Sequence, residues 1–178
     1  MTKTTKGKPC VFFDRDGIVN RSPGAGYVER MEDFHLLPEF VEALRVVLSR
    51  GYEAVVVTNQ RGVSLGRLTK ANLGAIHRKL EEHLKAQDLA LRDVLVCTAD
   101  DDTHPDRKPN PGMLLTAARR HHLDLARSWM VGDSERDVEA GHRAGCRTVL
   151  VGEKGKSSAA DFHVDVMADL PGFLAKQL

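Results

Sequence analysis

Short apolar runs alternate along this chain with segments whose apolar residues recur every three or four positions. The apolar runs cover residues 10–14, 54–58, 93–97, 128–131 and 147–151, with a weaker one near 162–164. Unbroken β-branched runs of this length are typical of strands buried on both faces of a parallel sheet. The three- and four-residue spacing predicts helices over residues 38–50, after Thr69, over 110–121, over 135–144 and near the C-terminus.

The residues at the ends of these segments support the same division. Thr69 and the Asn110-Pro111 pair are suitable starts for helices, and Gly51 and Gly145 are suitable stops. Alternating strands and helices predict a Rossmann-like α/β/α sandwich, in three layers around a mainly parallel sheet. We expect one domain over residues 1–178, with residues 1–8 as a frayed end.

Polar residues follow four of the predicted strands. The first strand leads into Asp14-Arg15-Asp16-Gly17 and the second into Thr58-Asn59-Gln60, while the loop after the third holds Arg107-Lys108 and the fourth leads into Gly132-Asp133-Ser134. In a parallel α/β sheet, ligands bind beyond the carboxyl ends of the strands. We therefore expect these residues to meet in one crevice.

The residue types in that crevice suit a metal ion and a phosphate. Asp14 and Asp16 are two positions apart, so an extended backbone directs both carboxylates the same way. With Asp133 they supply hard oxygen ligands, which suit Mg²⁺. Lys108 is a counter-charge for phosphate, Thr58 and Asn59 are neutral donors, and Gly17 lets amide N–H groups face an anion. Each feature alone is typical of a turn or a solvated strand end, so the prediction depends on their joint occurrence.

Composition excludes several other kinds of protein. The formal net charge is +1 and aromatic residues make up 5% of the chain, which argues against nucleic-acid and membrane partners. No apolar stretch follows the polar N-terminus, so no signal peptide is expected. The three cysteines are far apart and predict neither a disulfide nor a compact zinc site. A cytoplasmic monomer is the default expectation.

Five segments together resemble the haloacid dehalogenase-like (HAD) phosphatase superfamily over nearly the whole chain. They are DRDGIVN at 14–20, GYV at 26–28, VVVTNQRGV at 55–63, RKPNPGMLL at 107–115 and MVGDSERD at 130–137. More narrowly, they are similar to the branch that contains D-glycero-D-manno-heptose 1,7-bisphosphate phosphatase and histidinol-phosphate phosphatase. The short segments between the motifs imply a HAD-type core without a cap domain.

The resemblance implies a two-step phosphatase mechanism. Asp14 would attack phosphorus and form an aspartyl phosphate, and Asp16 would protonate the leaving group and then activate water. The metal would be Mg²⁺, held by Asp14, the Asp16 carbonyl and Asp133. The residues implied to contact the phosphate or the rest of the substrate are Arg15, Thr58, Asn59, Gln60, Arg107 and Lys108. Behind them, Ser134 and Asp137 would orient Lys108 or a metal-bound water.

Two departures from the branch affect the expected substrate and metal. Ile18 stands where a threonine is common, a change we expect to be tolerated. Members of the branch often carry a zinc loop before the Arg-Lys-Pro motif, whereas residues 98–106 contain no cysteine. Cys97 and His104 alone cannot complete a four-ligand site, so zinc is not expected. The first expectation for the substrate is a heptose bisphosphate, and the alternatives are histidinol phosphate or another sugar phosphate.

Three rival functions stay open at this point. Residues 62–66 read GVSLG and match the GxSxG element of serine hydrolases, but Ser64 falls within a predicted loop and not at a strand-to-helix turn. A catalytically silent, phosphatase-like binding module is a second rival. A phosphotransferase is the third, since only the entry of water distinguishes it from a hydrolase.

Overall fold

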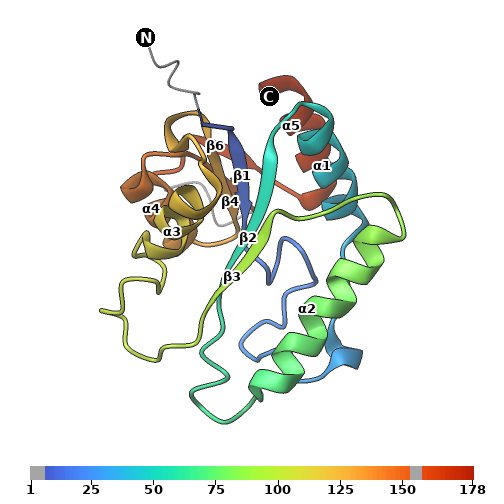
Figure 1. The fold of residues 1–178 in the computed structure, drawn as a ribbon, viewed down its shortest axis with the longest axis vertical. Helices are drawn as coiled ribbons and strands as arrows, with labels where there is room; N and C mark the ends of the chain where they lie inside the picture. The colour runs from blue at the N-terminus through green and yellow to red at the C-terminus, as the bar shows by residue number, and fades with distance from the viewer. Residues whose placement is uncertain (1–6, 153–157) are drawn as a thin grey trace.

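The computed structural model describes residues 7–152 and 158–178 and contains a six-stranded sheet (Figure 1). The strands are β1 (Cys10–Phe13), β2 (Glu53–Asn59), β3 (Asp93–Cys97), β4 (Trp129–Gly132), β5 (Arg147–Val151) and β6 (Phe162–Val164). Their order across the sheet is β3-β2-β1-β4-β5-β6, and every neighbouring pair is parallel. The predicted α/β fold is confirmed.

Helices cover both faces of the sheet, as Figure 1 shows. They are α1 (Pro38–Ser49), α2 (Lys70–Lys85), α3 (Gly112–His121), α4 (Glu135–Ala144) and α5 (Leu170–Gln177), with short 3-10 turns at η1 (Met31–Asp33), η2 (Leu125–Arg127) and η4 (Met167–Asp169). Side chains alternate along β1, so Val11 and Phe13 pack with α1, α2 and α5, while Cys10 and Phe12 pack with α3 and α4.

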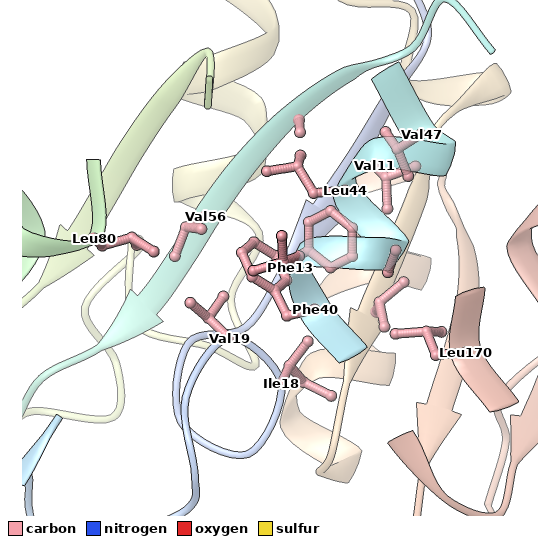
Figure 2. Close-up of a cluster of buried hydrophobic side chains, with 14 of the residues drawn as sticks. Val11, Phe13, Ile18, Val19, Phe40, Leu44, Val47, Val56, Leu80 and Leu170 are labelled. Atoms are coloured by element: carbon pink, nitrogen blue, oxygen red, sulfur yellow. The ribbon is translucent and has the colours of Figure 1, made fainter. Parts of the chain in front are cut away.

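The larger core lies between the sheet and α1 (Figure 2). The rings of Phe13 and Phe40 meet edge to face with centroids 5.2 Å apart, and Leu44 and Val47 continue the contact along the helix. Each fully buried side chain of this size contributes about 1.5–3 kcal/mol of transfer free energy. This packing fixes β1, the strand that leads directly into Asp14.

The start of α3 and the N-terminal end of the chain differ from what the sequence predicts. Asn110 does not cap α3, because its side-chain amide donates to the backbone oxygens of Asp102 and His104, and Pro111 takes the cap position. The predicted fraying is wrong for Lys8, whose backbone pairs with Leu123 and whose ammonium contacts Glu53. Residues 1–6 lie outside the described part of the chain.

The two segments where a cap domain could be inserted are both short. The segment between β1 and α1 contains only the turn η1, and the segment between β3 and α3 contains no helix or strand. The carboxyl edge of the sheet is therefore covered by loops. Among the described residues, no helix is both long enough and apolar enough to cross a membrane.

Candidate active site

Three neighbouring strand ends bring the main polar residues together. Asp14 follows β1, and its backbone N–H donates to Val131 of β4 at 2.9 Å. Asp133 directly follows β4, which pairs with β1 on one side, and Asn59 ends β2, which pairs with it on the other. The parallel register thus places side chains from distant parts of the sequence at one edge.

Lys108 is the centre of the site. Its side chain is only 3% exposed, and its Nζ atom donates to Asp14 Oδ1 at 2.7 Å, Asp137 Oδ1 at 2.6 Å and the Val57 carbonyl at 2.9 Å. These contacts use all the hydrogens that an ammonium group carries. The two carboxylates raise the pKa of Lys108 despite its burial, so the group stays charged.

Asp137 is held from its other side by the start of α4. It forms a capping box with Ser134, whose hydroxyl donates to Asp137 Oδ2 at 2.8 Å. The close approach of α4 to β4 requires Gly132, because a Cβ atom there would lie 2.2 Å from Asp137 Cβ. Ser134 and Asp137 therefore support Lys108 from behind and leave Asp14 facing the cavity.

A divalent cation fits the carboxylates beside Lys108. Asp14, Asp133 and Asp137 each offer an oxygen within 4.8 Å of the others, and when all three are ionised they and Lys108 carry a net charge of minus two. Gly17, at φ +94°, lets Asp133 approach, because a Cβ atom there would lie 2.1 Å from its Oδ2. Burial raises the pKa of Asp14 to about 7, with Lys108 opposing the shift and Asp137 adding to it. A cation would relieve this crowding of negative charge.

Asp16 lines the same cavity and is held by its neighbours. Its carboxylate accepts hydrogen bonds from Arg15, from Asn20 Nδ2 at 3.0 Å and from Gln60 Nε2 at 3.0 Å. Two of these donors, Arg15 and Gln60, are residues that the sequence analysis expects to contact the phosphate. The side chains of Arg15 and Gln60 are 0% and 2% exposed, and they bond to Asp16 instead of facing the cavity.

The remaining predicted substrate contacts are divided between the cavity and the protein interior. Asn59 lines the cavity, and its side chain also exchanges two hydrogen bonds with the Lys108 backbone. Thr58 is 1% exposed; its hydroxyl accepts from Gln60 and keeps its own hydrogen to donate. Arg107, also expected to contact the substrate, is 4% exposed, bonds to Asp102 and to the Ala99 carbonyl, and does not line this cavity.

The cavity itself has a volume of about 270 Å³. Two residues on its wall lie in the quoted motifs but were given no role from the sequence: Tyr27, in the loop before η1, and Arg136, in the first turn of α4. Arg136 is exposed, and, after the hydrogen bond and charge of Arg107, its charge is one of those that lower the pKa of Asp102. Its position just after the Gly132-Asp133 motif was the available signal, since the first turn of a helix after a strand end faces the crevice.

Two other sequence features lie outside this site. Ser64 is exposed in the turn between β2 and α2, and its hydroxyl donates to the Arg61 carbonyl, so the serine-hydrolase geometry is not formed. Cys97 Sγ lies 3.7 Å from His104 Nδ1. In the described part of the chain, the only group of acidic, histidine or cysteine side chains arranged for a metal is the one at Asp14.

Comparisons with known proteins show which family this chain resembles. A family profile described as HAD-hydrolase-like matches residues 106–177. D-glycero-beta-D-manno-heptose-1,7-bisphosphate 7-phosphatase of Salmonella typhi is 33% identical over 190 residues, covering 97% of this chain and 98% of that protein. The D-glycero-D-manno-heptose-1,7-bisphosphate 7-phosphatase of Thermosynechococcus vestitus is 36% identical over 157 residues, covering 81% of this chain and 79% of that protein.

Solved structures show the same relationship. The crystal structure of D,D-heptose 1,7-bisphosphate phosphatase from B. bronchiseptica, complexed with magnesium and phosphate, superposes with a TM-score of 0.85 at 31% identity, covering 96% of this chain and 99% of that one. The corresponding phosphatase from Burkholderia thailandensis gives a TM-score of 0.67 at 30% identity, covering 94% of this chain and 99% of that one.

Proposed function

This chain belongs to the HAD-like phosphatases, and from that premise we propose that it is a Mg²⁺-dependent phosphatase that uses Asp14 as its nucleophile. The observation that carries the proposal is the contact of Lys108 with Asp14 and Asp137 at 2.7 Å and 2.6 Å. Because Lys108 occupies Oδ1 of Asp14, the second oxygen is the one available for attack. A buried ammonium beside a reacting phosphate stabilises the charge that develops in the transition state.

The proposed reaction has two displacements at phosphorus. Asp14 attacks the phosphorus atom, the bond to the ester oxygen breaks, and Asp16 gives a proton to the departing alcohol. Asp16 then takes a proton from a water molecule that attacks the same phosphorus, and the bond to Asp14 breaks to release inorganic phosphate. Thr58 and Asn59 are proposed to donate hydrogen bonds to the phosphate oxygens.

We propose that Mg²⁺ is held by Asp14, Asp133 and the backbone carbonyl of Asp16. When bound, the ion supplies positive charge that balances the carboxylates and the phosphate. The three neighbouring carboxylates and the close approach of Asp133 permitted by Gly17 support this assignment. Asp137 is committed to Lys108 and to Ser134, which favours a supporting role for it.

For the substrate we propose a sugar bisphosphate, with D-glycero-D-manno-heptose 1,7-bisphosphate as the first choice. The names of the relatives support this choice. Arg136 supports it independently, because an exposed guanidinium on the cavity wall favours an ester with a second anionic group. The same charge disfavours histidinol phosphate, which carries an ammonium group at its other end.

We also propose that the enzyme acts as a monomer in the cytoplasm. All the residues proposed to react come from one chain, and the three cysteines of the sequence are unbonded and buried, as a reducing compartment permits. Light scattering at two protein concentrations tests the first part, because a stable dimer at both would contradict it.

The test of the function is phosphate release from a panel of esters with Mg²⁺ or EDTA. The panel contains heptose 1,7-bisphosphate, histidinol phosphate and para-nitrophenyl phosphate, and the proteins are wild type and Asp14→Asn. We expect release that requires Mg²⁺, is lost in Asp14→Asn and is fastest with the bisphosphate. Activity that survives in Asp14→Asn would remove the nucleophile from the proposal. Preference for histidinol phosphate would reassign the substrate.

A further inference from the structure

Arg15 is a buried charged residue that the mechanism above does not use directly. It stands between Asp14 and Asp16, yet its side chain is 0% exposed and lies against α2, away from the cavity that both aspartates line. A buried guanidinium must satisfy its donors, and leaving it unpaired is costly. The partners of its donors therefore indicate which side chains Arg15 holds in place.

The contacts of Arg15 distinguish the two oxygens of Asp16. Oδ1 receives Arg15 Nη2 at 2.9 Å, Arg15 Nε at 3.1 Å and Asn20 Nδ2 at 3.0 Å. Oδ2 receives Gln60 Nε2 at 3.0 Å and a longer contact from Arg15 Nη2 at 3.2 Å. Oδ1 therefore accepts three N–H contacts, whereas Oδ2 accepts one from Gln60 and shares Arg15 Nη2, which lies closer to Oδ1. Oδ2 is thus the less occupied oxygen and the better placed to carry a proton.

The other end of Arg15 is held by His77 of α2. The Nη1 atom lies 3.5 Å from His77 Nε2. Burial, reinforced by the charge of Arg15, lowers the pKa of His77 to about 4. The ring is therefore neutral near pH 7 and can present a lone pair to the guanidinium. Arg15 is thus fixed between a helix that packs on the sheet and the carboxylate at the strand end.

We propose that Arg15, held by His77, is a positioning residue that orients Asp16 so that its Oδ2 atom exchanges the proton with the leaving group and with water. This inference rests on the proposed function, in which Asp16 is the general acid and base. A buried ion pair that only stabilises the loop is the competing explanation. The two explanations predict different effects of removing Arg15 on the hydrolysis of esters with different leaving groups.

An alkoxide is a poor leaving group and needs a proton as it departs, whereas an acidic phenol leaves readily as its anion. The ratio kcat/KM reports on the steps up to the departure of the alcohol, when the aspartyl phosphate forms. A misoriented Asp16 therefore lowers kcat/KM for an alkyl ester much more than for para-nitrophenyl phosphate. A general loss of structure lowers both alike.

The experiment compares kcat/KM for heptose 1,7-bisphosphate and para-nitrophenyl phosphate in wild type, Arg15→Met, His77→Phe and Asp16→Asn. Arg15→Met is expected to lose about 100-fold on the alkyl ester and less than about fivefold on the aryl ester, within the usual range for general acid catalysis. Asp16→Asn shows the largest difference in kcat/KM loss between the two esters that removal of the general acid can produce. His77→Phe is expected to show a smaller loss with the same selectivity. Arg78→Met, an exposed neighbour of His77 on α2, is the matched control and should behave as wild type.

An equal loss on both esters in Arg15→Met, or no loss on either, overturns the inference. If Arg15→Met does not fold, His77→Phe decides, because it keeps the Arg15 side chain and removes only the contact that fixes its guanidinium from the α2 side. A selective loss there supports the inference, and an equal loss or none overturns it. If the wild-type protein hydrolyses neither ester, the proposed function itself is wrong. This outcome is distinct from the failure of the inference about Arg15.

Discussion

Replacing Lys108 by methionine tests the electrostatic centre of the site. The substitution keeps a long side chain but removes the ammonium that contacts Asp14 Oδ1 at 2.7 Å and Asp137 Oδ1 at 2.6 Å. It also leaves the Val57 carbonyl without its donor. The side chains of Asp14 and Asp137 are 13% and 2% exposed, so water cannot fully replace the lost contacts.

The expected cost follows from the burial of the two carboxylates. Removing one partner of a buried ion pair typically costs about 3–5 kcal/mol, because the other charge is left uncompensated. Asp14 limits this cost, since its pKa is already about 7 and it can take up a proton. Asp137 still accepts the hydroxyl and N–H of Ser134. We therefore expect Lys108→Met to lower the free energy of unfolding by about 3 kcal/mol, the lower end of that range.

Urea denaturation in EDTA measures this change without the contribution of a bound metal. A matched control is Lys70→Met, an exposed lysine at the start of α2, which should change stability by less than about 0.5 kcal/mol. Adding Asp137→Asn to Lys108→Met should recover about half of the loss, because it removes the more buried of the two uncompensated charges. A loss below about 1 kcal/mol, or a double variant no more stable than the single one, would refute the reasoning.

Three further predictions concern the metal, His77 and the substrate. Gly17→Ala should raise the Mg²⁺ concentration needed for half-maximal activity by about tenfold, because the new Cβ atom displaces Asp133. Gly51→Ala strains a glycine of similar φ in open space, so an equal effect there would show that strain, not Asp133, is responsible. Because folded His77 binds its proton only near pH 4 while the unfolded chain binds it near 6.5, the free energy of unfolding should fall between those values as the pH is lowered. The loss is at most about 3 kcal/mol, and urea titrations should find it absent in His77→Phe; a stability difference between the two proteins that is flat with pH would contradict this. Arg136→Gln should raise KM for the bisphosphate by about tenfold, as the loss of one charged hydrogen bond allows, and should leave KM for para-nitrophenyl phosphate nearly unchanged; equal effects would place Arg136 outside the substrate contact.

The secondary structure followed closely from local patterns. The run Cys10–Phe13 is apolar at every position because both faces of β1 are covered, and an unbroken apolar run between charged segments has few other interpretations. Thr69 caps α2 through a hydrogen bond from the Asn72 N–H, as its residue type predicted. The order of strands across the sheet did not follow in this way, because register and neighbours depend on contacts between distant segments.

Whether the direction of a side chain in the candidate site could be predicted depends on the length of that side chain. Asp14 and Asp133 are short residues at strand ends, so the backbone alone determines that they face the cavity. Asn110 and Arg107 have longer or more adaptable side chains, and each is bound to backbone oxygens of the loop after β3. Nothing in their immediate sequence specifies those acceptors, so the direction of these side chains could not be predicted.

For Arg15, the direction of the side chain could be predicted from the motif itself. The alternation that directs Asp14 and Asp16 to one side of an extended segment directs the residue between them to the other side. A side chain on that side enters the layer between the sheet and α2, where a guanidinium requires acceptors. Its acceptors are Asp16, next in sequence, and His77, which is 62 positions away. The burial of Arg15 was therefore deducible from the spacing of the two aspartates, whereas its second partner required the packing of α2 on the sheet.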